Sequence, residues 1–316
     1  MSSTMKAVVN ETYGAPEVLQ VQEVPVPLSG AGEVRVRVHA ASINPVDVKV
    51  RSGKSLAAQY GARPVILGYD VSGVVDALGE GVGEFRVGDE VYGMIRFPEE
   101  GKAYAEYATA PAGHLARKPK RLSHAEAAAV PLAALTAWQA LFEGGNLQSG
   151  QRALIHAAAG GVGHFAVQLA HWMGAEVLGT ASPTKAGFVR ALGADEVVDY
   201  TAGPFEERVA PVDFVLDTLG GEHQARSLRV LKPGGIVVTL LALAADPKQA
   251  EEAGRRLKRV VVYPSAEQLS EIAELIDAGK VTPHVSATFP LAEAAEAHRL
   301  VESGRVQGKV VLEVGG

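Results

Sequence analysis

The chain has 316 residues, with 30 Lys and Arg against 36 Asp and Glu, so its formal net charge is −6. A hydrophobic fraction of 47% and a charged fraction of 21% are typical of a folded globular protein and exclude a disordered chain. The mild acidity disfavours nucleic acid or an anionic membrane surface as the main partner, since both require clustered basic residues. The length predicts about two domains.

Cysteine is absent from the sequence. Disulfides, thiolate nucleophiles, zinc ribbons and iron–sulfur clusters are therefore excluded. Residues 1–6 lack the charged and apolar segments of a secretory signal. The sequence has no uninterrupted stretch of about 18 apolar residues, so we predict no membrane span. We expect a cytoplasmic protein.

The first 120 residues predict a β domain. Residues 34–38 alternate apolar and polar side chains with a period of two, as in a half-buried strand. Residues 71–75 and 90–92 predict further short strands, with glycine-rich turns at 79–83 and 88–89. Short strands with such turns favour a barrel-like domain.

From Ser123 the pattern changes to alternating helices and strands. Ser123 and Glu126 have capping-box spacing at the start of a long helical stretch that reaches about Gly144. Strands that alternate with helices indicate βαβ units and a parallel sheet. The expected strands are 152–156, 176–180, 196–199, 212–217 and 236–241, and the expected helices are 164–173 and 185–192.

The remaining segments follow this sheet. Residues 260–263 predict an edge strand, and residues 266–278 predict an amphipathic helix with one apolar face. A helix at 291–303 and a strand at 309–314 follow, and we expect this last strand to pair within the N-terminal β domain. The predicted division is 1–122, 123–264 and 265–316, with the first and third parts forming one domain.

The segment Ala-Ala-Ala-Gly-Gly-Val-Gly (157–163) joins a strand to a helix. This is the context of the G-x-G-x-x-G fingerprint of dinucleotide sites, with Ala158 in place of the first glycine. A glycine here lets the backbone approach a pyrophosphate, and the helix N-terminus offers N–H groups and partial positive charge. The alternative is a glycine turn without a ligand. The loop residues expected to bind are Ala158, Gly160, Gly161, Val162 and Gly163.

The end of the second strand indicates which dinucleotide binds. NAD enzymes usually carry an acid there for the ribose 2′-OH, but no acid occurs between Glu176 and Asp195. Instead, Ser182 offers a hydroxyl and Lys185 a cation, which suit a 2′-phosphate. Considered alone, Lys185 fits a solvated charge on the first turn of a helix better than a phosphate ligand. The combination predicts NADPH.

Seven stretches together carry a family resemblance: residues 41–47 (ASINPVD), 67–75 (LGYDVSGVV), 85–93 (FRVGDEVYG), 131–138 (PLAALTAW), 157–163, 217–221 (DTLGG) and 308–312 (GKVVL). They resemble the medium-chain dehydrogenase/reductase superfamily, in its zinc-independent quinone oxidoreductase (zeta-crystallin-like) branch. The resemblance implies an α/β protein with a doubly wound Rossmann domain inserted into a GroES-like β-barrel domain. It also implies an active site between the domains and a homodimer that pairs sheet edges.

The resemblance implies roles for individual residues. Lys185 and Tyr200 match positions that hold the adenosine 2′-phosphate, whereas Asn44, Asp47 and Thr136 match positions near the nicotinamide. Further residues expected to bind the cofactor are Thr180, Ser182, Asp217, Thr218, Leu240 and Lys309.

Zinc-dependent relatives bind metal through Cys residues and a Gly-His-Glu segment. This chain has Asn44 at the first position and Gly68-Tyr69-Asp70 at the second, so we expect no zinc. His156 is expected in the core. His298, in the helical run 296–298, is expected at the surface.

Residues 44–49 and 68–71 look closer to the alkenal/enone reductases of the same branch, since many quinone reductases carry Tyr where this chain has Lys49. In both reactions a carbonyl oxygen gains negative charge and needs a donor, for which Lys49, Asn44 and Thr136 are candidates. Lys49 is alternatively a solvated lysine at a strand end or a partner of Asp47.

The predicted function is NADPH-dependent, zinc-independent hydride transfer to a quinone. The alternative is reduction of α,β-unsaturated aldehydes or ketones. A zinc-type alcohol dehydrogenase and a non-catalytic dinucleotide-binding protein are further alternatives.

Overall fold

The computed structural model describes residues 3–60 and 63–315 and divides into two compact units. Unit 1 comprises residues 1–135, 263–279 and 283–316, and unit 2 comprises residues 136–262 and 280–282. Met1 and Ser2, at the start of the segment considered above for a signal, lie outside the described residues. In the described part of the chain, no helix has both the length and the apolar character that a membrane span requires.

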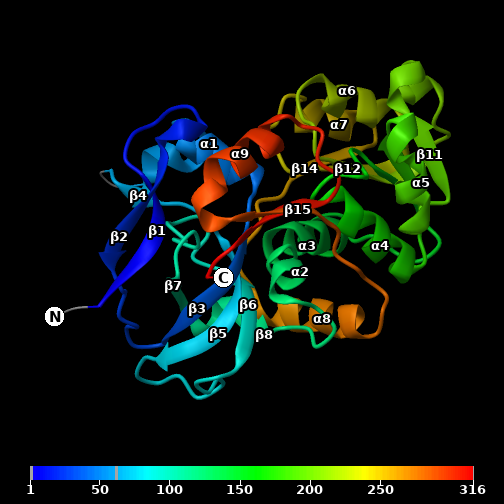
Figure 1. Ribbon diagram of the computed structural model, residues 1–316. Coiled ribbons are helices and arrows are strands. Elements are labelled where there is room, and N and C mark those ends of the chain that lie inside the picture. Colours follow the sequence, from blue (N-terminus) through cyan, green and yellow to red (C-terminus); the bar gives the residue numbers. More distant parts are fainter. Residues whose placement is uncertain (1–2, 61–62, 316) are drawn as a thin grey trace. The chain divides into compact units, whose positions relative to one another are not determined.

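Unit 1 contains two sheets (Figure 1). One has the order β2-β1-β4, and the other has the order β15-β16-β3-β5-β6-β8, with β7 also pairing with β3. The strands are β1 (Thr4–Asn10), β2 (Leu19–Pro25), β3 (Glu33–Ser42), β4 (Val65–Ile66), β5 (Asp70–Leu78), β6 (Glu90–Met94), β7 (Tyr107–Pro111), β8 (Leu115–Arg117), β15 (Val285–Pro290) and β16 (Lys309–Glu313).

Strand β3 organises the larger sheet. Its apolar residues Val34, Val36 and Val38 are buried, as the period of two predicts. The expected strands at 71–75 and 90–92 form parts of β5 and β6. The last strand returns as expected, since β16 pairs antiparallel with β3 and places Leu312 opposite Ala41.

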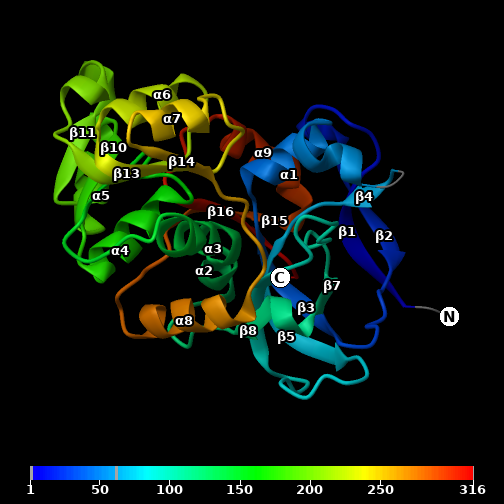
Figure 2. The same cartoon turned by 180° about the vertical axis from the view of Figure 1, so that it is seen from behind.

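The helices of unit 1 are short. They are α1 (Pro45–Arg51), α2 (His124–Ala128), α3 (Pro131–Trp138), α8 (Ala266–Asp277) and α9 (Ala294–Glu302), with 3-10 turns at Pro16–Val18, Ser55–Gln59, Ala112–His114 and Leu291–Glu293. The unit boundary falls within α3. Helices α1 and α9 lie side by side (Figures 1 and 2).

The single long helix predicted from Ser123 to about Gly144 is wrong. Helix α2 ends before Val130, α3 begins at Pro131, and a π-helical turn follows over Gln139–Gly144. Proline has no N–H and disfavours helical backbone in the residue before it, so α2 cannot continue through Pro131. The capping box at Ser123 is confirmed, with Glu126 N–H donating to Ser123 Oγ at 3.2 Å.

Unit 2 is a six-stranded parallel sheet of order β11-β10-β9-β12-β13-β14. Numbered within the unit, this is the 3-2-1-4-5-6 order of doubly wound dinucleotide-binding folds. Helices α6 and α7 lie on one face and α4 on the other (Figures 1 and 2). The strands are β9 (Arg152–Ile155), β10 (Glu176–Ala181), β11 (Glu196–Asp199), β12 (Val212–Asp217), β13 (Leu231–Thr239) and β14 (Arg256–Arg259). The helices are α4 (Gly163–Met173), α5 (Pro183–Ala191), α6 (Glu222–Arg229) and α7 (Pro247–Glu252), with 3-10 turns at Tyr200–Ala202 and Phe205–Glu207.

Two expectations about the borders of this sheet differ from the structure. The edge strand is β14, not residues 260–263, because Val260 makes the final bond to the Thr239 carbonyl and the chain then leaves the sheet. Unit 2 comprises Thr136–Val262 and Lys280–Thr282, whereas the predicted inserted domain comprises residues 123–264. Helix α2 packs against β3 and β5, so it belongs with unit 1.

Candidate functional site

The loop between β9 and α4 lies where the strand order of unit 2 reverses, which is where doubly wound sheets bind ligands. The N–H of Ala157 donates to Thr180 Oγ1 at 3.1 Å, and the N–H of Ala158 donates to the Thr180 carbonyl at 3.0 Å. A Cβ on Gly163 would lie 2.2 Å from the Ala157 carbonyl oxygen, so this turn accepts only glycine at that position. Thr180 and Gly163 thus shape the loop.

The start of α4 fits a pyrophosphate. The helix begins without a side-chain cap, so its dipole favours an anion there, although the His164 N–H already donates to the Gly160 carbonyl at 3.0 Å. Gly160, Gly161 and Val162 precede it on the loop. Ala158 is fully buried, and a Cβ on Gly179 of β10 would lie 2.7 Å from its methyl group, so the alanine at the first fingerprint position packs against the sheet.

The ends of β10 and β11 bring the expected 2′-phosphate residues to one edge of the sheet. Ala181 and Asp199 are paired in the parallel ladder, so the segments that start at Ser182 and Tyr200 leave from adjacent strand ends. Ser182 is the N-cap residue of α5, and Lys185 lies in its first turn. Partial burial lowers the pKa of the Lys185 ammonium.

Two further polar groups at this edge were not predicted. Thr184 Oγ1 lies 3.0 Å from Ser182 Oγ, and Arg208 donates to the carbonyl of Asp199 at 2.6 Å, one residue before the exposed Tyr200. Arg208 adds a cation to this strand end. Its position in an irregular segment nine residues after Asp199 provides no sequence signal.

Asp217 and Thr218 hold the neighbouring strand ends together. The Asp217 carboxylate accepts the N–H groups of Leu219 and Gly220 at 3.0 and 2.9 Å and the hydroxyl of Thr239 at 2.7 Å. The Thr218 hydroxyl donates to the His156 carbonyl at 3.1 Å. These contacts are internal, so cofactor contact by this pair stays a prediction. Leu240 follows β13 half-buried, Thr136 is buried in α3, and the expected core position of His156 is confirmed.

In unit 1, a buried polar cluster surrounds Asn44. Its amide Nδ2 donates to Asp70 Oδ2 at 2.9 Å, and its Oδ1 accepts from Lys309 Nζ at 2.5 Å. Lys309 also donates to the Ile43 carbonyl at 3.1 Å and lies 3.7 Å from Asp70 Oδ2. Burial raises the pKa of Asp70 and lowers the pKa of Lys309. The charge of each group partly offsets the pKa shift of its partner. The Lys309 ammonium makes these internal contacts, and its expected contact with the cofactor stays a prediction.

Asp70 is the centre of this cluster, and sequence analysis assigned it no role. It also accepts the Ser42 hydroxyl at 2.7 Å and the N–H of Leu132, in the first turn of α3, at 2.8 Å. Ends of β3, β5, β16, α1 and α3 therefore meet at one carboxylate. A signal existed, because a carboxylate within the mostly apolar run 67–75 is costly to bury without partners.

Asp47 is buried beside this cluster. Its Oδ2 accepts the backbone N–H of Asn44 at 2.8 Å, which caps α1, while Oδ1 is buried and has no hydrogen-bond partner among residues 3–60 and 63–315. Burial is the main cause that raises the pKa of Asp47 to about 7. The nearby Asp70 charge acts in the same direction, and the Asn44 N–H, Lys309 and Tyr104 act against it. Asp47 is thus a carboxyl that holds its proton close to neutral pH.

Lys49 is exposed in the last turn of α1, two residues from the buried Asp47. It therefore lies on a helix rather than at a strand end, and its catalytic role stays a prediction. The cation that contacts Asn44 is Lys309, from a strand more than 250 residues further along the chain.

The expectation that His298 lies at the surface is wrong. His298 is fully buried, because α9 packs on α1 and turns this side chain inward. Its Nε2 lies 3.3 Å from the Tyr104 hydroxyl, and its Nδ1 lies 3.4 Å from Arg51 Nη1. Arg51 is also buried and pairs with Glu302 at 2.6 Å. Burial and the Arg51 charge lower the pKa of His298 to about 3.

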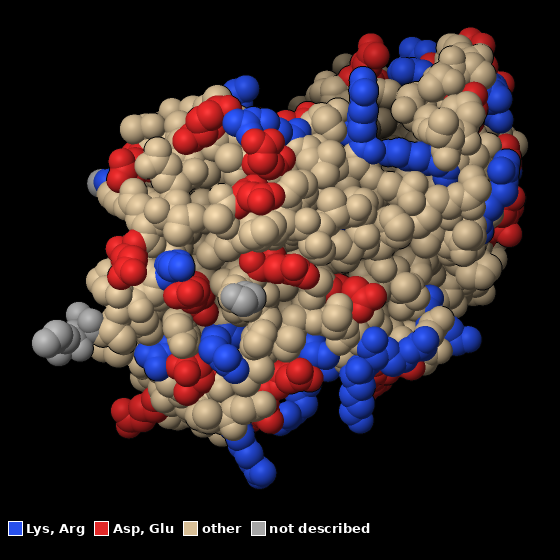
Figure 3. Space-filling view, in the orientation of Figure 1, with Lys and Arg blue, Asp and Glu red and all other residues tan. Residues whose placement is uncertain are grey.

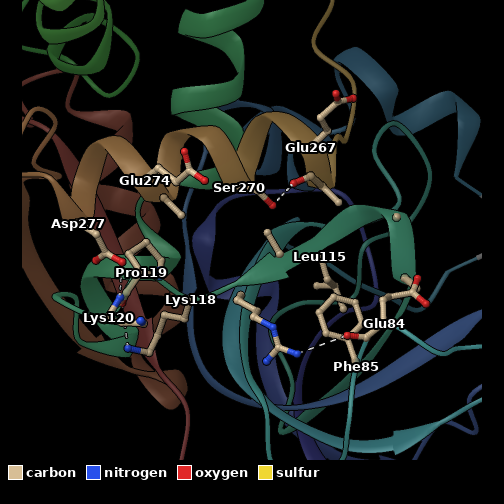
Figure 4. Close-up of a pocket in the computed structure, with 16 residues that line it drawn as sticks. Glu84, Phe85, Leu115, Lys118, Pro119, Lys120, Glu267, Ser270, Glu274 and Asp277 are labelled. Carbon is tan, nitrogen blue, oxygen red and sulfur yellow. Dashed lines mark hydrogen bonds between the residues drawn. The ribbon is translucent and has the colours of Figure 1, made fainter.

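A surface pocket of about 480 Å³ also lies in unit 1, between α8 and the segment that starts with β8 (Figure 4). Cations and carboxylates both line it, and Lys120 N–H donates to Asp277 Oδ2 at 3.2 Å. None of the predicted site residues lines this pocket. Among residues 3–60 and 63–315, no group of three or more His, Cys, Asp or Glu side chains is placed to hold a metal ion.

A unit of two mainly antiparallel sheets together with a doubly wound dinucleotide-binding sheet is the architecture of two-domain dehydrogenases. Family profiles agree, since "Alcohol dehydrogenase GroES-like domain" matches residues 30–120 and "Zinc-binding dehydrogenase" matches residues 192–312. The solved structure of the quinone oxidoreductase from Coxiella burnetii superposes with a TM-score of 0.94 at 37% identity, covering 99% of this chain and 100% of that one.

Two relatives extend the comparison. NAD(P)H oxidoreductase RTN4IP1, mitochondrial, of Mus musculus is 38% identical over 99% of this chain and 90% of its own. NADPH-dependent alkenal/one oxidoreductase, chloroplastic, of Arabidopsis thaliana is 36% identical over 98% of this chain and 79% of its own. The chain belongs to the medium-chain dehydrogenase/reductase family, in its zinc-independent quinone oxidoreductase branch, with features of the alkenal/enone reductases. It is an oxidoreductase of the NAD(P)H-using kind.

The expectation of a cytoplasmic protein is contradicted. The mouse, zebrafish, human and cattle relatives are all named as mitochondrial proteins. Absence of a recognisable signal in residues 1–6 was therefore not a sufficient basis for assigning a compartment.

Proposed function

We propose that this protein is an NADPH-dependent reductase that transfers hydride to a quinone. The observation that carries the cofactor assignment is the paired ends of β10 and β11, which bring Ser182, Lys185, Tyr200 and Arg208 to one sheet edge without an acid at the ribose position. A 2′-phosphate suits these hydroxyl and cationic groups, whereas a ribose 2′-OH would call for a carboxylate.

The nicotinamide supplies the hydride when it is bound. The residues of the chain then have two tasks. The 157–163 loop and the start of α4 bind the pyrophosphate, and the cluster at Asn44 provides donors for a carbonyl oxygen that gains negative charge. Asp47 and Lys309 lie beside Asn44 as groups that hold protons.

A second candidate acceptor is an α,β-unsaturated aldehyde or ketone. The Arabidopsis relative named for alkenals and enones supports it, at an identity close to that of the Coxiella quinone oxidoreductase. Both acceptors already carry an activated carbon, so neither requires a metal to polarise it. Charges of both signs are mixed over the face shown in Figure 3, which supports a small-molecule substrate rather than nucleic acid or a membrane.

The cofactor assignment is tested by comparing NADPH and NADH oxidation with a panel of 1,4-benzoquinones, 2-alkenals and enones. Lys185→Ala should raise KM for NADPH by about 10- to 100-fold and leave KM for NADH unchanged, since one charge-assisted contact is lost. Arg190→Ala, at the exposed far end of the same helix, is the matched control and should change neither constant. Preference of the unmodified protein for NADH would refute the assignment.

We also propose a homodimer formed through the free edge of β14. This strand has β13 as its neighbour on one side, and Val261, which follows it, is 55% exposed. Unpaired edges are commonly covered by a second chain. Light scattering should give a mass of twice 33.0 kDa, and Val261→Asp should lower it.

A further inference from the structure

The amide of Asn44 lies between two ions of opposite sign. Its Oδ1 faces the ammonium of Lys309, and its Nδ2 faces the carboxylate of Asp70. An ammonium can only donate hydrogen bonds, and an ionised carboxylate can only accept them. The two ions therefore permit one orientation of the amide, because the reversed orientation would set donor against donor and acceptor against acceptor.

This arrangement leaves one hydrogen-bond donor unused. Nδ2 carries two hydrogens, and Asp70 accepts one of them. No acceptor for the second is found among the described residues. Because Lys309 withdraws electron density through Oδ1, the remaining N–H is a stronger donor than that of an ordinary amide.

The cost of the ion pair also points to a role beyond stability. Lys309 has a side chain only 4% exposed, and Asp70 is fully buried. Apolar residues of similar volume usually stabilise a protein at least as much as a buried ion pair does. A geometric role for Lys309 explains why a lysine occupies this position.

We propose that Lys309 is a positioning residue, which fixes the Asn44 amide so that its second N–H is presented to a carbonyl oxygen at the reaction site. This inference rests on the proposed function, in which the cluster at Asn44 provides donors for a carbonyl oxygen. The carbonyl belongs either to the carboxamide of the cofactor or to the acceptor, and the experiments below separate the two.

A double-mutant cycle tests whether Lys309 acts through Asn44. Lys309→Met should lower kcat with 1,4-benzoquinone by about 10- to 100-fold, as misplaced active-site groups do, while KM for NADPH changes less than about threefold if the acceptor carbonyl is the ligand. If KM for NADPH rises by a similar factor instead, the ligand of the second N–H is the cofactor carboxamide. In an Asn44→Ala background, Lys309→Met should have almost no further effect on either constant. Independent, multiplicative effects would overturn the proposal.

Two variants control for charge and burial. Lys309→Arg should recover part of the lost activity, because a guanidinium also only donates. Lys118→Met is the matched control, since the Lys118 side chain is only 6% exposed. Its ammonium donates to the Leu122 and Pro119 carbonyls at 2.5 and 3.3 Å and lies 3.4 Å from a Glu90 carboxylate oxygen (Figure 4 shows its position). This control should leave kcat unchanged. An equal loss of kcat in Lys118→Met would show that any buried lysine of unit 1 has this effect and would overturn the proposal.

The single change at Lys309 leaves Asp70 buried without its cation, which can prevent folding. The double variant Lys309→Met with Asp70→Asn removes both charges and keeps a side chain of the same shape. Its circular dichroism and Tm should be close to those of the unmodified protein, whereas kcat should remain low because the amide is no longer held by two ions. Wild-type kcat in this variant would overturn the proposal.

A measurement without turnover is possible because the chain has only three asparagines, Asn10, Asn44 and Asn146. Protein labelled with 15N at asparagine side chains should give three pairs of amide signals, with Asn10 and Asn146 as internal references. Lys309→Met should shift and broaden the Asn44 pair, and Lys118→Met should not. NADP⁺ alone should shift one Asn44 proton if the cofactor carboxamide is the ligand.

The spectra also separate the two proposals. If the unmodified protein fails to oxidise NADPH with every acceptor of the panel, the proposed function is refuted. The spectra would still decide whether Lys309 holds the amide. Unchanged Asn44 signals in Lys309→Met would overturn the positioning role.

Discussion

Asp47→Asn should make the protein more stable at neutral and alkaline pH. The buried carboxyl has a pKa of about 7 in the folded protein, against an ordinary value of 3.8. Its contribution to stability is fully present below pH 3.8 and is lost as the pH rises toward 7, because the unfolded chain releases this proton earlier than the folded one. Asparagine keeps an oxygen that can accept the Asn44 N–H, and it never ionises.

The magnitude follows from the pKa difference. One proton of difference between the two states changes the free energy of unfolding by about 1.4 kcal/mol per pH unit. Between pH 5 and pH 8 the stability advantage of Asp47→Asn should grow by about 3 kcal/mol. Histidines buried in the neutral form act in the opposite direction below pH 6.5, so the difference between the two proteins, not either profile alone, isolates Asp47.

Urea unfolding of both proteins at four pH values between 5 and 8 measures this difference. Asp89→Asn is the matched control, because Asp89 Oδ2 accepts the Arg86 N–H at 2.9 Å with the same three-residue spacing but at the surface. The Arg117 side chain holds the pKa of Asp89 below its usual value, so this variant should lose stability. A difference between Asp47→Asn and the unmodified protein that stays flat from pH 5 to 8 would refute the reasoning.

Two further predictions concern unit 2. Gly163→Ala should lower the stability of unit 2 by about 3 kcal/mol and weaken NADPH binding, because the new Cβ would lie 2.2 Å from the Ala157 carbonyl oxygen. Thermal melts measure the change in stability. In the control Gly187→Ala nothing lies within 4 Å of the new Cβ, so this variant should be neutral or stabilising. His156→Gln should flatten the loss of stability on acidification, because burial lowers the pKa of His156 to about 4 and its stabilising contribution is lost as the pH falls from 6.5 to 4. Urea titrations at pH 4.5 and 7 check this, and identical slopes for both proteins would contradict it.

The elements of unit 2 were predictable because each strand is a short apolar run followed by a turn. The boundaries of 196–199 and 212–217 were predicted without error. The prediction of a strand at 260–263 was wrong because apolar composition alone does not determine which residues pair with a neighbouring strand. Ile236 pairs with Arg256, so the segment that pairs with β13 ends at Arg259, before the predicted run begins. Four mostly charged residues therefore form β14.

The polar network of unit 1 was beyond prediction for a different reason. Arg51, Tyr104 and His298 come from segments far apart in the chain, and each alone has the pattern of a surface or packing residue. Lys49 was predicted as a donor because it stands where many quinone reductases carry Tyr. Lys309 has the contact with Asn44 because β16 pairs with β3 and delivers its first residue to the end of that strand.

This pairing has a consequence for synthesis. Strand β3 leaves the ribosome more than 260 residues before β16. Strand β7 covers Glu33–Arg37 early, but the partner of Ala40–Ser42 arrives only after the whole of unit 2 is made. Unit 2 is nearly continuous in sequence and can complete its sheet during that time, whereas unit 1 closes only when β16 arrives. The nascent chain thus carries Asp70 without its ammonium partner for most of translation. Chaperones that shield exposed sheet edges have their longest opportunity at β3.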